Sequence, residues 1–263
     1  MQLGASVLGF FYGRGPESWP TLAEAVDEIR SLDNALGVEV WGARAHDQPM
    51  VEGQDLVDLV DACQGAAFTT VHIQGQHWSW NPATLRREID FAHQLGAGTL
   101  VLHPVCLGLQ VPDDRPDWPE IIRIADYAAK FGVCLAVENI FDSVWCLDRI
   151  LEEIGDDPEE TNVGICIDVG HAMMSKDAGR ESVCNYLDRY ASQLLHLHLH
   201  DNAGTCDEHL VPGQGAVDWP RVLAKIDAIS FAGTAVVEAH LPGNSPIQCV
   251  KQALAFLKQA KSS

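Results

Sequence analysis

Six residues that can bind a metal ion or transfer a proton follow apolar, strand-like segments of the sequence. They are His72, His103, Glu138, Asp168, His198 and Glu238. Successive members of this set are 30 to 40 residues apart, close to the roughly 31 residues per unit of a barrel built from eight strand–helix repeats. Converging carboxylates repel one another unless a positive group lies between them. The pattern therefore predicts a divalent cation where the strands end.

The stretch 194–200, LLHLHLH, alternates leucine with histidine. Side chains alternate across a strand, so His196, His198 and His200 share one face, and Leu195 lies on the other with the two leucines that follow it. We expect the histidines to point into the barrel, with His198 as a metal ligand and His196 as a buried structural neighbour, whereas the role of His200 stays open. Carboxylates with imidazoles suit Zn²⁺, Mn²⁺, Co²⁺ or Fe²⁺, and an oxygen-rich site with water also takes Mg²⁺.

Three more candidate residues lie just beyond the strands. The step from Asp168 to His171 is D-x-x-H with a glycine between, so the chain can turn and bring both side chains to one pocket. Asp207 and His209 lie in the longest segment between two strands, and the glycine-rich VPGQGAVDW follows them. We interpret this segment as a lid that returns to a helix capped near Asp218.

Apolar segments alternate with amphipathic ones along the chain, and eight strands each followed by a helix predict a parallel sheet. Eight such units in about 250 residues are typical of a (β/α)8 TIM barrel, so we predict one α/β domain over residues 1–263. A doubly wound sheet is the alternative, but no G-x-G-x-x-G follows the first strand. The expected strands are 2–9, 37–42, 68–74, 99–104, 133–139, 163–169, 194–200 and 234–240. The clearest helical patterns are 21–36, 54–63, 82–96, 118–132, 143–154 and 246–260.

Composition limits the partners of the chain. Its 17 basic residues stand against 37 acidic ones, for a net charge of −20, whereas a protein that grips nucleic acid normally carries a basic stripe. No apolar run approaches the roughly 20 residues of a membrane-spanning helix, and the N-terminus lacks the basic lead-in of a secretory leader. The eight cysteines form no C-x-x-C pair, which favours free thiols in a reducing cytoplasm.

Several motifs together resemble the xylose isomerase-like TIM barrels. This superfamily holds sugar isomerases, ketose 3-epimerases, hydroxypyruvate isomerase, inosose dehydratase and endonuclease IV. The resemblance covers nearly the whole chain and is carried by VEVWG, LVLHP, VENIF, CIDVGHA, HLHLHDN, DEHLVPGQGAVDW and VVEAH. These motifs are specific to the superfamily and discriminate weakly among its members.

The resemblance implies roles for the residues at the strand ends. In epimerase-type members, the positions matching Glu138, Asp168, His198 and Glu238 bind one divalent metal. Glu138 and Glu238 would also flank the substrate as a proton-transfer pair, and the position matching His171 contacts substrate. Endonuclease IV adds further ligands and builds a three-zinc cluster. Its additional ligands match His72, His103, His171, Asp207 and His209.

All nine of these residues are present, so a trinuclear zinc phosphodiesterase is the main alternative. The acidic composition and a first strand that only partly resembles the nuclease argue against it. Many epimerases place an arginine before the Pro-Gly of the lid, where this chain has His209, which weakens a ketohexose-epimerase assignment and leaves the wider isomerase class open. A metal-dependent lyase such as a dehydratase, or a catalytically silent sugar-binding barrel, are further alternatives.

We therefore expect a cytoplasmic, metal-dependent isomerase or epimerase of a small sugar or polyhydroxy carbonyl compound, in carbohydrate metabolism. The metal would stabilise an enediolate while Glu138 and Glu238 exchange the proton, and His171 and His209 would hold substrate hydroxyls. Trp41, Trp78 or Trp80 would form an apolar wall. The scarcity of Lys and Arg near the strand ends disfavours a phosphorylated substrate. The sequence does not set the oligomeric state.

Overall fold

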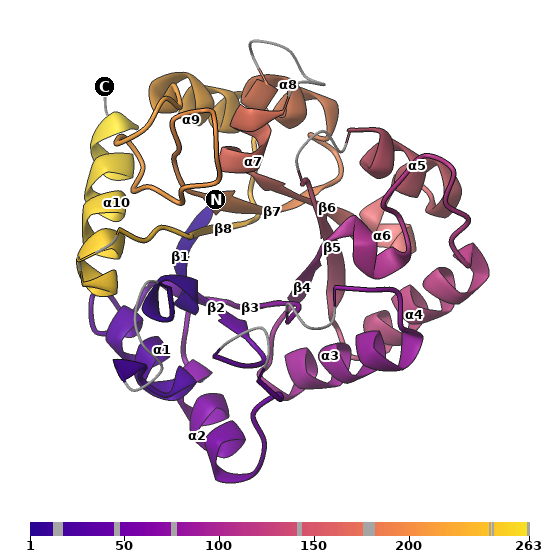
Figure 1. The fold of residues 1–263 in the computed structure, drawn as a ribbon, viewed down its shortest axis with the longest axis horizontal. Helices are drawn as coiled ribbons and strands as arrows, with labels where there is room; N and C mark the ends of the chain where they lie inside the picture. The colour runs from indigo at the N-terminus through magenta and orange to yellow at the C-terminus, as the bar shows by residue number, and fades with distance from the viewer. Residues whose placement is uncertain are drawn as a thin grey trace.

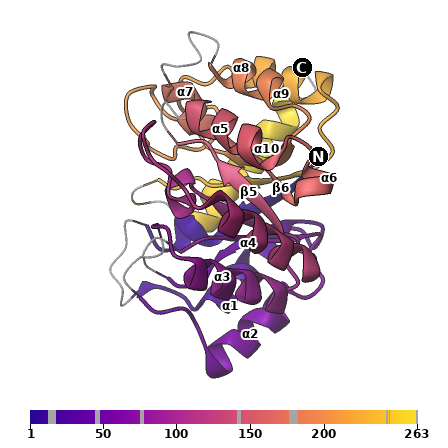
Figure 2. The same ribbon diagram turned by 90° about the vertical axis from the view of Figure 1, so that its right-hand side faces the viewer.

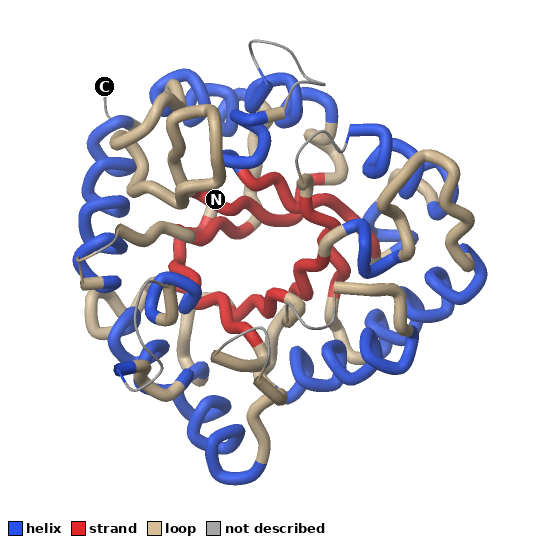
Figure 3. The backbone as a smooth tube through the Cα atoms, in the orientation of Figure 1, coloured by secondary structure: helices blue, strands red, loops and turns tan. Residues whose placement is uncertain are grey.

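Short apolar segments of the chain form a closed parallel barrel. The computed structural model describes residues 1–12, 18–44, 48–74, 78–140, 144–175, 182–241, 243 and 245–261. Each strand pairs with the next one, and β1 pairs with β8, so the described strands make a complete ring (Figures 1 and 3). The strands are β1 Gln2–Ser6, β2 Gly37–Trp41, β3 Thr69–His72, β4 Thr99–Leu102, β5 Cys134–Glu138, β6 Val163–Asp168, β7 Leu194–Leu199 and β8 Thr234–Val237.

Helices surround this ring, and several begin at side chains that cap a helix. Asn81, Asp117 and Asp218 each accept a hydrogen bond from the first turn that follows. In Figure 2 the helices of the first half of the chain lie below the barrel and those of the second half above it. The helices are α1 Leu22–Arg30, α2 Gly53–Cys63, α3 Pro82–Gln94, α4 Trp118–Lys130, α5 Val144–Ile154, α6 Pro158–Thr161, α7 Val169–Met174, α8 Ser182–Arg189, α9 Trp219–Ala228 and α10 Pro246–Ala260, with 3₁₀ turns η1 Val7–Phe10 and η4 Pro104–Leu107.

The main hydrophobic core lies between the strands and the helices. Outward residues such as Val71, Leu100 and Ile167 belong to it and are fully buried. A smaller cluster of Val101, Ala136 and Cys166 fills the barrel interior. Two of these lie one inward step before Glu138 and Asp168, as the alternation predicts.

One prediction about strand β7 is wrong. Leu195 packs against the interior cluster, whereas Leu197 and Leu199 belong to the outer core. The register between β6 and β7 shifts here, because Ile165 pairs with Leu194 and the next residue of β6 pairs with His196. This irregularity leaves Leu195 as an extra residue, so the strict alternation fails at this position.

The predicted fold class, a single-domain (β/α)8 barrel, is confirmed by this architecture. The predicted strands and the cap of α9 at Asp218 are present, whereas the short helices α6, α7 and α8 were not among the expected elements. All eight cysteines lie within the described residues and are reduced. In the part of the chain that the structure describes, no helix combines the length and hydrophobicity needed to cross a membrane.

Candidate metal centre

Nine candidate residues predicted from the sequence converge at the carboxyl ends of the strands. Five of them end or directly follow strands β3 to β6 and β8, and His198 is the penultimate residue of β7. His171 lies in α7, and Asp207 and His209 come from the segment between β7 and α9. The residues from the strands and α7 are buried, which is unusual for charged groups without a partner. The buried members are His72, His103, Glu138, Asp168, His171, His198, His209 and Glu238.

His198 is the centre of the arrangement. Its Nδ1 atom lies 3.4 Å from Glu138 Oε1 and 3.4 Å from Glu238 Oε2. The same atom lies 3.7 Å from Asp168 Oδ2. His198 and Asp168 are fully buried, so little solvent screens these contacts.

Glu138 contacts imidazoles on both of its carboxylate oxygens. Its Oε2 atom lies 3.1 Å from His72 Nε2 and 3.1 Å from His103 Nε2. Its Oε1 atom lies 3.2 Å from Nδ1 of His171, in addition to its contact with His198. One carboxylate thus belongs to two groups of possible ligands.

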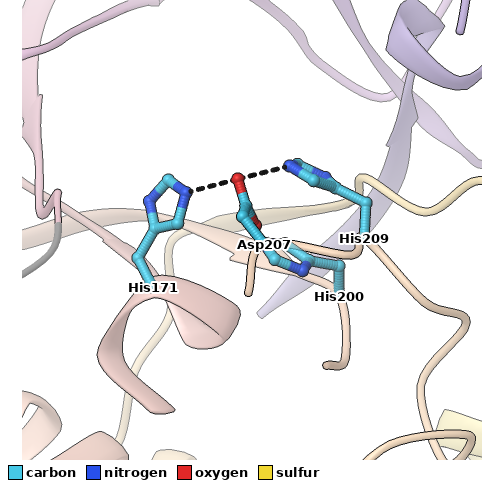
Figure 4. A group of neighbouring side chains, drawn as sticks. All are labelled: His171, His200, Asp207 and His209. Atoms are coloured by element: carbon cyan, nitrogen blue, oxygen red, sulfur yellow. Dashed lines mark hydrogen bonds and ion pairs between the residues drawn. The ribbon is translucent and has the colours of Figure 1, made fainter. Parts of the chain in front are cut away.

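A second cluster lies on the loop side of the centre, as Figure 4 shows. Asp207 Oδ2 stands between two histidines, 3.3 Å from Nε2 of His171 and 3.2 Å from Nε2 of His209. His200 lies beside them, with its ring stacked on that of His209 at a centroid distance of 4.0 Å. Ligand atoms of these four residues all lie within 4.8 Å of one another.

His200, whose role the sequence left open, joins this cluster to the centre. Its Nε2 atom lies 2.9 Å from Asp168 Oδ1 and 3.7 Å from Asp207 Oδ1. The ring packs directly over Gly170 of α7, where an added Cβ would stand 1.9 Å from His200 Cε1. The glycine of the D-x-x-H step lies within α7 and is needed because a side chain there would collide with the His200 ring.

Local hydrogen bonds hold Asp168 and His171 in place. Asp168 caps α7, because its Oδ1 accepts a hydrogen bond of 2.7 Å from the backbone N–H of His171. Asn139, directly after β5, accepts from the backbone N–H of Asp168 at 2.7 Å and donates to its carbonyl at 3.1 Å. The carbonyl of Asn139 lies 2.9 Å from Nδ1 of His171. Sequence reasoning did not single out Asn139.

Glu39 is a second residue that sequence reasoning missed. It lies in the middle of β2, is fully buried, and its Oε2 atom is 3.3 Å from Nε2 of both His196 and His198. The available signal was a glutamate within the apolar stretch GVEVW, on the same strand face as Trp41. His196 is buried beside it, as predicted, with Nδ1 2.6 Å from Thr234 Oγ1.

The carboxylates of the centre differ in their proton affinity. Burial favours a higher pKa for Glu138, but nearby positive imidazoles, His198 foremost, hold that pKa well below its usual range. Burial also favours a higher pKa for Asp168, but His171 and His200 hold that pKa well below its usual value. At Glu238 burial prevails and raises the pKa.

His171 and His198 carry positive charge that offsets the charge of these carboxylates. Burial alone would lower the pKa of His171, but Asp168, Asp207 and Glu138 raise it well above the usual value. The pKa of His198 is likewise raised well above its usual range, against burial, by the negative groups around it. Imidazolium groups therefore balance the carboxylates in the absence of another cation.

His198 and the three carboxylates near its Nδ1 atom offer ligands that suit a divalent metal ion. Ligand atoms of Glu138, Asp168 and His198 lie within 4.8 Å of one another. Two ligand atoms that share a tetrahedral ion at ~2.1 Å lie about 3.4 Å apart, the separation found from Nδ1 to Glu138 and Glu238. Within the described residues, neither His198 Nδ1 nor Glu238 Oε1 has a hydrogen-bond partner although both are buried. Glu238 Oε1 is thus a buried acceptor without a donor, which is costly, and a cation is a natural partner for it.

The centre opens into a cavity of about 490 Å³. Glu138, Glu238, His171 and His209 line the cavity together with aromatic and aliphatic side chains. Of the three tryptophans expected in the wall, Trp41 and Trp78 line the cavity, whereas Trp80 packs against the outer core. Trp145 of α5 is an additional wall residue. A pocket of this size, with a few convergent polar groups, is typical of a small-molecule site.

Comparison with known proteins agrees with this architecture. Residues 2–260 match the family model described as the xylose isomerase-like TIM barrel. The chain belongs to this family. An uncharacterised protein of Mycobacterium leprae is 30% identical over 252 residues, covering 84% of this chain and 85% of that protein.

Two other proteins that resemble the chain carry names or titles that refer to sugar epimerases. The fructoselysine 3-epimerase of Shigella flexneri is 26% identical over 252 residues, covering 83% of this chain and 86% of that protein. The crystal structure of a D-tagatose 3-epimerase-like protein has a TM-score of 0.70 at 20% identity, covering 100% of this chain and 98% of that one. At this identity the structural match shows the shared fold.

Proposed function

We propose that the protein is a divalent-metal-dependent isomerase or epimerase of a small sugar or related polyhydroxy carbonyl compound. The observation that carries this proposal is the convergence of three carboxylates on one imidazole nitrogen, within 3.4 to 3.7 Å. Glu138, Asp168, His198 and Glu238 would hold the metal. Two similar proteins are named fructoselysine 3-epimerase and D-tagatose 3-epimerase-like protein. These names support the reaction class.

The bound metal would act as a Lewis acid that polarises a substrate carbonyl and acidifies the adjacent C–H bond. Glu138 and Glu238 both border the cavity, so each can reach a substrate carbon. One of these glutamates removes the proton and the other returns it at the neighbouring carbon or on the opposite face. His171 and His209 also line the cavity and would hold substrate hydroxyls, while the tryptophan wall excludes water.

The expected substrate is small and without a phosphate. The cavity of about 490 Å³ falls in the range of ordinary small-molecule sites, roughly 300–1,000 Å³. Its lining contains acidic, imidazole and aromatic side chains but no lysine or arginine among the described residues. A phosphate group would therefore find no fixed cationic side chain in this cavity.

A screen in deuterated water tests the proposal. The protein, loaded with Mn²⁺, Co²⁺ or Zn²⁺, is incubated with a panel of aldoses, ketoses and inososes, and NMR detects deuterium at the carbon next to the carbonyl. We expect exchange and a new isomer with at least one compound. Failure to exchange with every panel member under all three metals would contradict the proposal.

The substitution Glu138→Gln should abolish most of that turnover. Proton transfer by a placed side chain contributes about 10²–10⁴-fold to a rate, so we expect at least a hundredfold loss of kcat. Glu152→Gln, on an exposed position of α5, is the matched control and should leave kcat unchanged. Full activity of the Glu138→Gln variant would remove this residue from the proton-transfer role.

A trinuclear metal phosphodiesterase is the second candidate, and the ligand geometry supplies the reason. Four sets of ligand atoms lie within 4.8 Å of one another, and one of them, Glu39 with His196 and His198, does not border the cavity. The other three are His72 with His103 and Glu138, Glu138 with Asp168 and His198, and the four residues of the loop-side cluster. Metal analysis of the purified protein separates the candidates, because one ion per chain favours the isomerase and three favour the nuclease. Cleavage of a duplex with an abasic site would establish the second candidate.

A further inference from the structure

Glu39 is a fully buried carboxylate that the proposed reaction does not use. It lies in β2 between Val38 and Val40, which belong to the outer core, so its side chain points into the barrel. No part of it is exposed, and it is absent from the residues that line the cavity. A buried carboxylate costs several kcal/mol in desolvation, so nearby groups must offset that cost.

Two hydrogen-bonding groups and a third, nearby imidazole nitrogen surround one oxygen of Glu39. The hydroxyl of Thr70 on β3 donates a hydrogen bond of 3.1 Å to Oε2. Nε2 of His198 forms a hydrogen bond of 3.3 Å with the same oxygen, and Nε2 of His196 lies 3.3 Å away. Glu39 lies in β2, Thr70 lies in β3, and the two histidines lie in β7. These contacts therefore also connect three strands across the barrel.

This contact favours one tautomer of the neutral His198 ring. An ionised carboxylate only accepts hydrogen bonds, so the proton of a neutral His198 must be on Nε2, which faces Glu39. The lone pair is then on Nδ1, the atom that faces Glu138, Asp168 and Glu238. The ring is therefore both oriented and set in the tautomer that a metal ion requires.

We propose that Glu39 is a positioning residue for the metal centre, which acts by accepting the Nε2 proton of His198 and directing its Nδ1 lone pair at the metal. This inference rests on the metal site proposed above. A carboxylate behind a ligand histidine also raises the basicity of the imidazole, and removal of such a partner typically lowers metal affinity by about 10–100-fold.

His196 is the third residue that lies beside Glu39. Its Nδ1 lies 2.6 Å from the hydroxyl of Thr234, which can donate to that nitrogen and leave the Nε2 proton of His196 directed toward Glu39. The ring of His196 stands edge-on to that of His198, at 5.2 Å and 85°. Thr70 thus donates a hydrogen bond to Glu39, His196 lies against the same oxygen, and Glu39 contacts His198.

The substitution Glu39→Gln tests the role of the charge. The amide keeps the size of the side chain and retains one acceptor, but the negative charge is lost. We expect the dissociation constant for Mn²⁺ or Zn²⁺, measured by calorimetry with a competing chelator, to rise by about 10–100-fold. Glu88→Gln is the matched control, because Glu88 is an equally buried glutamate that accepts from the backbone N–H of Gln74 outside the centre. The metal affinity of the Glu88→Gln variant should equal that of the wild type.

A second variant and a spectroscopic measurement keep the test independent of folding. Thr70→Val removes the hydroxyl donor to Glu39 and should weaken metal binding by a smaller factor than Glu39→Gln. In the zinc-loaded wild type, long-range ¹H–¹⁵N NMR should show His198 protonated at Nε2 and bound through Nδ1. A merely structural role for Glu39 would not determine that tautomer.

The possible outcomes separate this inference from the proposed function. Wild-type protein that binds no metal would overturn the metal site and this inference together. Metal binding by the wild type with unchanged affinity in folded Glu39→Gln would overturn the role of Glu39 alone. Coordination of His198 through Nε2 would also overturn it, whatever the affinity.

Discussion

At the scale of single residues, the centre depends on close contacts that admit no additional atom. Gly170 is the clearest case, because a Cβ there would stand 1.9 Å from Cε1 and 2.4 Å from Nδ1 of His200. His200 in turn contacts the carboxylate of Asp168 at 2.9 Å. The position of a proposed metal ligand thus depends on the lack of a side chain two residues away in sequence.

The substitution Gly170→Ala should destabilise the protein although alanine is the better helix former. Helix propensity alone would favour alanine by about 1 kcal/mol, but the clash forces the imidazole to move, and overpacking typically costs about 1–3 kcal/mol. We expect a lower free energy of unfolding in urea and weaker metal binding. Gly98→Ala is the control, since nothing lies within 4 Å of its added Cβ. Equal or higher stability of Gly170→Ala would show that the ring has room to move.

At the scale of elements, the segment after β7 is fixed by one buried aspartate. Asp201 accepts hydrogen bonds from the backbone N–H of Gly213 at 2.8 Å and of Val217 at 3.1 Å. It also accepts from Trp219 Nε1, at the start of α9, at 2.9 Å. Its backbone forms an antiparallel bridge with Leu210. The segment that carries Asp207 and His209 is therefore anchored at both ends.

Replacing Asp201 with Asn should loosen this segment. The amide nitrogen would face N–H donors, and a buried donor left without an acceptor costs about 1–3 kcal/mol. We expect reduced stability and faster hydrogen exchange at the N–H groups of Gly213 and Val217. Asp218→Asn serves as control, because asparagine caps a helix about as well as aspartate. Unchanged exchange at both N–H groups would show that the backbone bridge is sufficient.

At the scale of the whole molecule, the metal-free protein depends on protonated histidines to balance its buried carboxylates. At His209, burial would lower the pKa, but Asp207 and Glu238 raise it to about 9. A folded pKa above the unfolded value of about 6.5 means that protonation stabilises the fold. This contribution is complete below about pH 6.5 and is lost as the pH rises through about 9.

We therefore expect the Tm of the metal-free protein in EDTA to fall between about pH 6.5 and 9. With saturating Mn²⁺ or Zn²⁺ the Tm should be higher, because the metal stabilises the folded state that binds it. Calorimetry at several pH values, with and without metal, measures both effects. A metal-free Tm that stays constant or rises over this window would contradict the explanation.

The sequence predicts most of this molecule, and the exceptions share a physical cause. The positions of His72, Glu138 and Asp168 follow from strand alternation, which is local. The role of Glu39 depends on barrel closure, because it contacts histidines 157 and 159 residues later in the chain. Leu195 departs from the pattern because the pairing register of β6 and β7 shifts. Neither closure nor register is encoded within a short stretch of residues.

The two oxygens of the Glu138 carboxylate have different partners, and this has a thermodynamic consequence. Oε2 contacts His72 of β3 and His103, which follows β4, and Oε1 contacts His198. Ions in the two neighbouring groups would compete for, or share, the electron density of one side chain. Their occupancies are then linked, and by reciprocity each ion alters the affinity of the other by the same factor. A titration with metal would depart from the curve of independent sites.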